Sequence, residues 1–331
     1  MRTRCILVLG LGLGLVAPSV RAADWPQWRG ANRDGKVTGF TAPSAWPKEL
    51  TKKWKTTVGL GDSSPALVGN RAYAFTRQGK EEVTTCLNAE TGKPLWQDKY
   101  AAPEVTGPPS SHPGPRSSPA VGQGKVCTLG VAGVLSCLNA ATGAVVWRKD
   151  SKAWPDFYTA YSPLIVDGKC IAYLGGRGTG TLSAFDLTTG DEKWKWTGDG
   201  PSYGSPVLVT IGGIKQLVTP TEKSLLGISV ADGRLLWQTP FQGGRFNTGT
   251  PVVDGQTVIC SGRAFTIEKQ GDVLAAKELW KGEAPSQFNT PVLRDGLLYG
   301  LSGRRNLFCV DAKTGAVAWT DPTPRGECGA I

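Results

Sequence analysis

The sequence is poor in the residues from which many metal and catalytic sites are built. Its 331 residues include one histidine and one methionine, and none of its eight cysteines is adjacent to another. A single histidine excludes a histidine-rich metal site or a two-histidine zinc helix, and it leaves none to spare for a Ser-His-Asp triad. The formal net charge is +10 without any run of lysine and arginine suited to nucleic acid. We therefore expect no metal site and no nucleic-acid partner.

Only the N-terminus has a long apolar stretch, and residues 1–22 are predicted to be a cleaved signal peptide. Arg2 and Arg4 precede the apolar residues 6–16, and a small-residue cleavage site ends at Ala22. The stretch is too short to cross a bilayer as a helix, which disfavours a retained anchor. Cys5 lies ahead of it, and no cysteine is near the cleavage site. We expect a periplasmic or secreted protein with no membrane span and no lipid anchor.

The remaining chain is a tandem repeat. Each unit ends in a Thr-Gly or Asp-Gly turn, and a tryptophan follows the glycine by four residues. These glycine–tryptophan pairs are Gly92 and Trp96, Gly143 and Trp147, Gly190 and Trp194, Gly233 and Trp237, and Gly315 and Trp319. Trp280 ends a divergent copy without this turn, and Trp54 ends a half-copy at the front. The units begin at Ser/Thr-Pro steps, whose first residues are Ser64, Ser118, Ser162, Ser205, Thr250 and Thr290.

Between these landmarks the pattern predicts strands only. Short β-rich runs alternate with turn signals such as Asp167-Gly168 and Asp295-Gly296, and helical periodicity is absent. Four strands in a unit of about 40–50 residues are typical of a β-propeller blade. A β-solenoid or separate sandwiches are the alternatives, and the length of the unit disfavours a solenoid. The fold prediction is an all-β propeller with six recognisable four-stranded blades, in which each repeat tryptophan packs against the neighbouring blade.

The ending Ala-x-x-Thr-Gly-x-x-x-Trp resembles the tryptophan-docking motif of the pyrroloquinoline-quinone-type propeller repeat, and this resemblance covers most of residues 46–331. Residues 24–35 (DWPQWRGANRDG), within the N-terminal segment 23–45, resemble the leading segment of exported bacterial propellers of the BamB-like family. Propellers of that family typically have eight blades, closed by strands from both ends of the chain. The resemblance therefore implies a propeller that is incomplete at its C-terminus.

The resemblance also bears on activity. Quinone-dependent dehydrogenases of this repeat family need a calcium ion held by Glu, Asn and Asp oxygens, a general-base Asp and a disulfide between adjacent cysteines. This chain has no adjacent cysteines and no Cys-x-x-Cys-His haem motif. We expect an exported, non-catalytic scaffold that binds another envelope protein and has no cofactor. The alternative is a quinone- or carbohydrate-binding propeller related to an oxidoreductase, with pyrroloquinoline quinone suggested by the resemblance alone.

The cysteines are predicted to be mainly structural. Cys86, Cys137 and Cys309 occupy the same place ahead of the repeat turn, which indicates a small buried residue. Cys127 and Cys137 flank a tight turn and should lie opposite one another on neighbouring strands, so a cross-strand disulfide is a second hypothesis for this pair.

A ligand site, if present, is predicted on the face where the chain enters the central channel, just before each first strand. The polar residues at these positions are His112, Arg116, Tyr158, Tyr161, Tyr203, Arg245, Asn247 and Asn289. They could hold a polar ligand or peptide, or they could satisfy loop backbone groups around a narrow channel. His112 has no visible partner for general-base chemistry. The glycine-rich residues 175–180 are better explained as a hairpin than as a phosphate loop. For residues 25–29, packing on the propeller and an exposed interaction edge both remain open.

Overall fold

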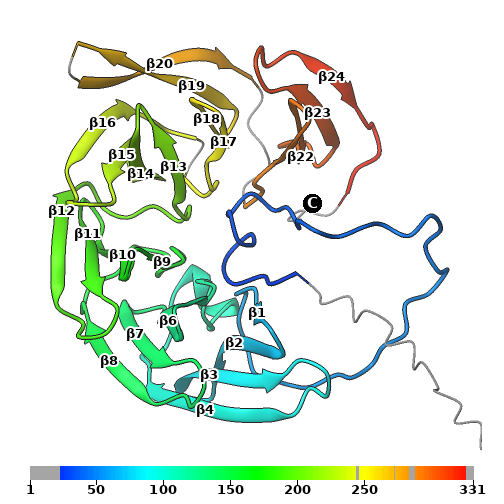
Figure 1. Cartoon of the computed structure of the whole chain (residues 1–331), viewed down its shortest axis with the longest axis vertical. Helices are drawn as coiled ribbons and strands as arrows, with labels where there is room; N and C mark the ends of the chain where they lie inside the picture. The colour runs from blue at the N-terminus through cyan, green and yellow to red at the C-terminus, as the bar shows by residue number, and fades with distance from the viewer. Residues whose placement is uncertain (1–22, 244–245, 272, 283–287, 326–331) are drawn as a thin grey trace, which may run out of the picture.

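The computed structural model describes residues 23–243, 246–271, 273–282 and 288–325. Within them, 24 strands form six four-stranded antiparallel sheets, and one short 3-10 turn, η1 (Pro108–Ser111), precedes the second sheet. Figure 1 shows the sheets as blades around a common centre, in an arc that is open between the last blade and the first. The predicted all-β propeller with six blades is confirmed.

Each blade is a meander of four consecutive strands, from the centre outward. Blades 1, 2 and 3 comprise β1 (Ala66–Val68), β2 (Arg71–Gln78), β3 (Glu81–Asn88), β4 (Pro94–Ala101); β5 (Ala120–Gly122), β6 (Lys125–Leu129), β7 (Val134–Asn139), β8 (Val145–Asp150); and β9 (Leu164–Val166), β10 (Lys169–Gly176), β11 (Thr179–Asp186), β12 (Glu192–Gly198). Blades 4, 5 and 6 comprise β13 (Val207–Ile211), β14 (Ile214–Pro220), β15 (Ser224–Ser229), β16 (Leu235–Pro240); β17 (Val252–Asp254), β18 (Thr257–Cys260), β19 (Arg263–Gln270), β20 (Val273–Lys281); and β21 (Val292–Arg294), β22 (Leu297–Leu301), β23 (Leu307–Asp311), β24 (Val317–Thr320).

The repeat turn between the third and fourth strands of a blade is fixed by its own sequence. In blade 1 the Asn88 side-chain oxygen accepts hydrogen bonds from the backbone nitrogens of Glu90 and Thr91, at 3.0 and 2.9 Å. The same turn forms at Asn139, Asp186 and Asp311. Gly92 then adopts a φ of +69°, which glycine reaches without steric cost. This local bonding holds the turn in one shape.

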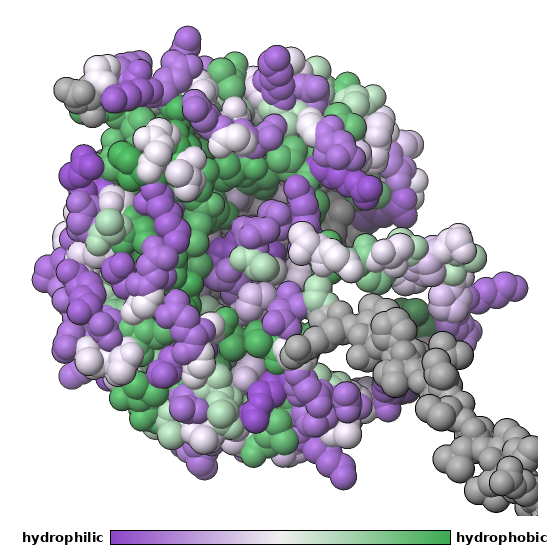
Figure 2. Space-filling model, viewed as in Figure 1, coloured by the Kyte–Doolittle hydropathy of each residue, from purple (hydrophilic) through white to green (hydrophobic). Residues whose placement is uncertain are grey.

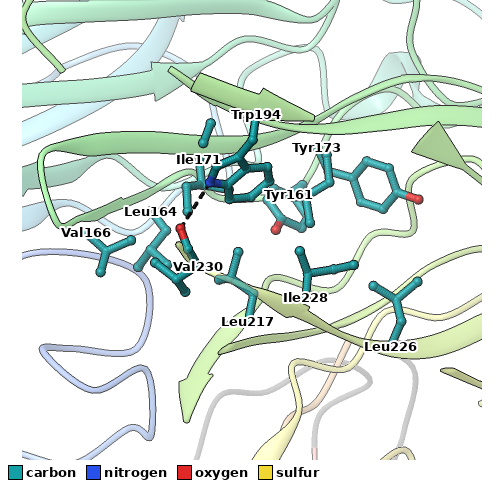
Figure 3. Close-up of a cluster of buried hydrophobic side chains, with 12 residues drawn as sticks. Tyr161, Leu164, Val166, Ile171, Tyr173, Trp194, Leu217, Leu226, Ile228 and Val230 are labelled. Atoms are coloured by element: carbon teal, nitrogen blue, oxygen red, sulfur yellow. Dashed lines mark hydrogen bonds between the residues drawn. The ribbon is translucent and has the colours of Figure 1, made fainter. Parts of the chain in front are cut away.

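The turn receives the tryptophan of the preceding blade or, in blade 1, Trp54 from the segment before β1. The indole nitrogens of Trp54, Trp96, Trp147, Trp194 and Trp280 donate to the carbonyls of Ala89, Ala140, Leu187, Val230 and Ala312, at 2.9–3.3 Å. Each ring lies so close to the turn glycine that an added Cβ would come within 2.5–2.7 Å of it. Figure 3 shows the hydrogen bond from the Trp194 indole to the Val230 carbonyl.

Two of the seven repeat tryptophans do not dock on a following turn. The indole of Trp237 instead donates to Gln216 Oε1 of its own blade, at 2.6 Å. The next blade is the divergent copy, whose long β19–β20 hairpin has no Asx-Thr-Gly turn to receive it. Trp319, on the last strand, is 46% exposed and contacts Tyr299 of its own blade.

A small residue lies directly opposite the tryptophan in every blade. These third-strand residues are Cys86, Cys137, Ala184, Gly227, Ala264 and Cys309, and a register shift follows each of them. Side chains opposite one another in an antiparallel pair share a face of the sheet, so a small residue leaves room for the indole. The bulge also bends the outer strand. This explains why cysteine recurs at the position.

The apolar core is divided among the interfaces between blades. One cluster lies between blades 3 and 4 and includes Tyr161, Leu164 and Trp194 from one blade and Leu217 and Val230 from the next (Figure 3). Similar clusters join the other neighbouring blades. Figure 2 shows apolar surface between blades and mostly polar side chains around the rim. Burial between blades is therefore the main source of stability in this fold.

A glycine comparison tests the contribution of docking. Gly143 and Gly124 both lie in turns of blade 2, with φ of +77° and +73°, but only Gly143 faces an indole, that of Trp96. Gly143→Ala is expected to destabilise the protein by about 1–3 kcal/mol more than Gly124→Ala. Both variants introduce similar backbone strain, but only the Cβ at position 143 collides with an indole ring. Chemical unfolding of the two variants measures the difference. Equal losses would show that the close ring contact does not constrain the turn.

Candidate functional site

The chain's own residues 24–35 run through the inside of the arc (Figure 1). Trp25 pairs with Leu67 of β1 through two backbone hydrogen bonds of 2.7 and 2.8 Å. The carbonyl of Pro26 accepts from the backbone nitrogen of Val121 in β5 at 2.8 Å. The indole of Trp28 donates to Thr250 Oγ1, next to β17, at 2.9 Å. The segment therefore contacts blades 1, 2 and 5 before its arginines are considered.

Arg33 joins blades 3 and 4 and is 2% exposed. Its Nη1 donates to the carbonyls of Ser162 and Pro206, at 3.2 and 3.1 Å, and its Nη2 donates to the carbonyl of Pro163. Its Nε donates to Gln27 Oε1 at 3.0 Å. Burial lowers the pKa of Arg33 to about 10, so the guanidinium is still charged at neutral pH. A buried cation is held here by uncharged oxygens.

Arg29 also donates to main-chain carbonyls, in this case those of blade 6. Its Nη1 donates to the carbonyl of Thr290 at 3.0 Å, and its Nη2 donates to that of Pro291 at 2.8 Å. Burial lowers the pKa of Arg29, too, to about 10. Both Arg29 and Arg33 adopt a φ of +58°, a left-handed conformation that costs about 1–2 kcal/mol for a residue with a Cβ. Contacts to the blades must offset this strain.

The Ser/Thr-Pro steps that supply these carbonyls are themselves linked. The backbone nitrogen of the first residue in one step donates to the hydroxyl of the next at 3.0 Å, for Ser64 to Ser118, Ser118 to Ser162, Ser162 to Ser205, and Thr250 to Thr290. Between blades 4 and 5 the Thr250 hydroxyl accepts from Trp28. The Ser/Thr-Pro steps therefore form an inner ring of hydrogen bonds between neighbouring blades. The repeat pattern located these steps but did not indicate that they bond to one another.

Two of the predicted site residues lie on the loop before β5. His112 is exposed, with its Nδ1 3.2 Å from both carboxylate oxygens of Asp62. Arg116 is half-buried, and its Nη2 donates to the carbonyl of His112 at 2.8 Å. Its Nη1 is buried and has no hydrogen-bond partner among the described residues. Burial lowers the pKa of Arg116, whereas Asp62, Tyr158 and Tyr203 act in the opposite direction.

The predicted tyrosines have different surroundings. Tyr161 is fully buried in the cluster between blades 3 and 4, where its ring lies edge-on to Tyr173, and burial raises its pKa. Tyr158 is also buried and stacks on Trp154. Tyr203 is half-buried, and its hydroxyl accepts from the backbone nitrogen of Phe157 at 3.2 Å. Only Tyr203 of the three remains on the face.

The predicted asparagines bond to the backbone. Asn247 is 4% exposed and donates to the carbonyl of Thr221 at 2.7 Å, while its side-chain oxygen accepts from Gly243 at 2.7 Å. Asn289 is 3% exposed, and its side-chain oxygen accepts from Leu301 at 3.2 Å. These contacts match the alternative in which such side chains satisfy loop groups. Arg245 lies outside the described residues.

Tyr203 belongs to an aromatic cluster that the sequence did not indicate. The rings of Phe157, Tyr203 and Phe246 meet edge to face, with centroids 4.9–6.2 Å apart. All three side chains are partly exposed. We refer to these three residues as the aromatic cluster. Together with the half-buried guanidinium of Arg116 on the neighbouring loop, it offers an apolar contact and a positive charge.

The interface between blades 1 and 2 contains a buried acid, Glu82. It is 1% exposed, and it accepts hydrogen bonds from the backbone nitrogen of Val131 and the hydroxyl of Tyr100. Burial raises the pKa of Glu82, against the effect of these hydrogen bonds and of Arg77 and Arg116. The folded state therefore binds the proton more tightly than the unfolded state does.

This shift predicts a pH-dependent effect of Glu82→Gln. A raised folded-state pKa contributes stability that is fully present below the unfolded pKa and is lost as pH rises through the folded pKa. Glutamine keeps an acceptor for Val131 and does not ionise. The variant is therefore expected to gain stability relative to the original protein as pH rises from about 4 to 8, as followed by urea unfolding at each pH. A difference that is constant or shrinks with pH would contradict the shift.

The structure has Cys127 and Cys137 directly opposite one another in β6 and β7, as expected, but as free thiols. A cross-strand disulfide between them therefore stays a prediction, which their opposed positions permit. Cys86, Cys137 and Cys309 are buried, as the repeat position indicated.

The residues present do not fit pyrroloquinoline quinone with calcium. Among the described residues, no three His, Cys, Asp or Glu side chains are placed to hold a metal ion. Arg29 and Arg33 lie inside the arc, bonded to carbonyls of blades 3, 4 and 6. A cavity of about 90 Å³ lies between blades 5 and 6, with Thr250, Asn289 and Trp280 in its lining. Ligand pockets are typically about 300–1,000 Å³, so this cavity is too small for the cofactor.

In the described part of the chain, no helix has the length and apolar character needed to cross a membrane.

The family model described as outer membrane protein assembly factor BamB matches residues 20–133 and 79–321. BamB of Burkholderia pseudomallei is 24% identical over 277 residues, which cover 71% of this chain and 70% of that protein. BamB of Yersinia pestis is 24% identical over 280 residues, or 81% of this chain but only 60% of that protein. The crystal structure of BamB from Moraxella catarrhalis has a TM-score of 0.55 at 17% identity and covers 80% of this chain and 73% of its own. The chain therefore belongs to the BamB family of pyrroloquinoline-quinone-type β-propellers.

Proposed function

We propose that the protein is an exported, non-catalytic propeller that binds another envelope protein and acts as an assembly scaffold. The observation that carries this proposal is the occupied centre, where Arg29 and Arg33 are bonded to inner carbonyls of blades 3, 4 and 6. Binding is then left to the faces and edges of the blades. Membership of the BamB family supports a role in assembly, and the predicted signal peptide supports export.

On the face before the first strands, the aromatic cluster and Arg116 have the character of a protein-binding site. Aromatic and arginine side chains are enriched where protein interfaces carry most of their binding energy. The half-buried Arg116 adds a positive charge beside the cluster, where burial raises the pKa of Tyr203 and this charge acts against that rise. A carboxylate of the partner would be attracted by this charge. We assign Arg116, Tyr203, Phe157 and Phe246 to partner contact.

Site-specific photocrosslinking in the source organism tests this assignment. A photoreactive residue at Phe246 is expected to crosslink to one envelope protein, and the yield should fall at least tenfold when Arg116→Ala is added. The same residue at Lys313, in the exposed turn of blade 6, is the matched control and should not crosslink to that protein. Equal products from both positions would refute a specific face.

A titration distinguishes the quinone-binding alternative from the scaffold proposal. Purified protein beginning at Ala23 is mixed with pyrroloquinoline quinone and calcium while tryptophan fluorescence is recorded. We expect no saturable change, because the cavity between blades 5 and 6 is too small and no three His, Cys, Asp or Glu side chains of the described residues are placed to hold calcium. Saturable quenching at micromolar concentration would overturn the scaffold proposal.

A further inference from the structure

Residues 24–35 behave structurally as a ligand of the propeller. They contact all six blades: blade 1 through Trp25, blade 2 through Pro26, blades 3 and 4 through Arg33, blade 5 through Trp28 and blade 6 through Arg29. The segment forms only an isolated backbone bridge with β1 and is not a strand of any sheet. Its hold on the blades therefore depends mainly on side chains that reach main-chain carbonyls.

The chain that follows this segment does not fix it in place. Among the described residues, residues 37–53 form no hydrogen bond. Three of their large apolar side chains, Phe40, Trp46 and Leu50, are 60%, 62% and 78% exposed. In Figure 1 this connection runs along the open side of the arc before it reaches blade 1. It acts as a tether, which raises the local concentration of the segment without positioning it.

The blades present a preformed receptor for the two arginines. The carbonyls of Ser162, Pro163 and Pro206 face Arg33, and those of Thr290 and Pro291 face Arg29. These carbonyls belong to the Ser/Thr-Pro steps, whose hydroxyl–backbone bonds link neighbouring blades. Without a donor, such buried carbonyls would be costly. The planar guanidinium, with five donors, suits several carbonyls at once better than an ammonium does.

We propose that the inner ring of Ser/Thr-Pro carbonyls is a recognition site for a peptide of the pattern Trp-Arg-x-x-x-Arg. Residues 24–35 occupy the site in the same chain, and the corresponding segment of a second copy of this chain can occupy it in exchange. Trp28 supplies the tryptophan, and Arg29 and Arg33 supply the two arginines. The site is independent of the face assigned to the partner, so either proposal can fail without the other.

The test is peptide exchange into a nicked full-length chain. A protease recognition sequence is inserted after Thr41, where the connection is exposed, and the folded protein is cut. A fluorescent peptide of residues 23–36 is added, and its anisotropy and the released native segment are measured. We expect saturable binding to the nicked protein and at least tenfold weaker binding to uncut protein, whose tethered segment competes.

Peptides with single substitutions test whether the site recognises arginine specifically. Arg33→Lys and Arg29→Lys peptides keep the charge and are each expected to bind at least tenfold more weakly, since they lack the planar group. Binding by all three peptides with equal affinity would overturn arginine recognition. Failure of the labelled peptide to enter nicked protein, whether or not the native segment leaves, would overturn an exchangeable site. Should the nicked protein unfold, it is refolded with each peptide, and refolding that does not depend on Arg33 refutes the proposal.

Discussion

Replacing Arg33 by alanine is expected to lower the free energy of unfolding by about 3–5 kcal/mol, the largest loss among single polar substitutions in the described chain. The variant leaves the carbonyls of Ser162, Pro163 and Pro206 buried without their donor, and it opens a void at the centre. Arg33→Lys should recover only part of this loss, because an ammonium lacks the planar fork. Denaturant unfolding followed by tryptophan fluorescence measures both variants.

The control is Arg177→Ala. The Arg177 side chain is 79% exposed, and its ion pair with Asp156, at 3.4 Å, lies on the surface. Removing it should change stability by less than about 0.5 kcal/mol. If Arg33→Ala unfolded at the same denaturant concentration as Arg177→Ala, the central arginine would not be holding blades 3 and 4 together.

The fold could be predicted from the sequence because its determinants are local and repeated. Four of the five turns that receive a tryptophan are built from an Asx residue, a glycine and a carbonyl within five positions, as at Asn88–Gly92, and the fifth has Ser229 in place of the Asx residue. Each copy therefore carries its own signature. The copy that ends at Trp280 lacks this turn. Trp237, one blade earlier, therefore has no turn to dock on and bonds within its own blade.

The central contacts could not be predicted in this way. Arg29 and Arg33 bind main-chain carbonyls, which every residue possesses, so no side chain elsewhere in the sequence marks the partner. The available signal was two tryptophans and two arginines, Trp25, Trp28, Arg29 and Arg33, ahead of the first strand. That composition indicates a structured segment but not the site where it binds.

The expected ring of polar side chains was only partly assembled. Position before a first strand does not determine which way a side chain points, and Tyr161 enters the core between blades while Tyr203 stays on the face. Asn247 is taken up by loop carbonyls for the same reason, since a buried backbone needs partners. The aromatic cluster was missed because Phe157, Tyr203 and Phe246 belong to loops of different blades.

Trp147→Ala is the second large expected effect, a loss of about 3–5 kcal/mol. The Trp147 side chain is 8% exposed, lies against Gly190 and Phe185 of blade 3, and donates to the carbonyl of Leu187 at 3.3 Å. Removing it leaves a cavity between blades 2 and 3 and an unpaired carbonyl. Thermal and denaturant unfolding of the purified variant measure the loss.

Trp319→Ala is a closely matched comparison, because Trp319 has the same place in its blade as Trp147. Both follow a repeat turn, and both lie opposite a cysteine, Cys309 or Cys137, next to a bulge. Trp319 differs in facing no described turn of a following blade, and it is 46% exposed. Its removal should cost less than about 1 kcal/mol. Losses of equal size would mean that the tryptophan stabilises its own sheet, and that contact with the next blade's glycine is not what holds neighbouring blades together.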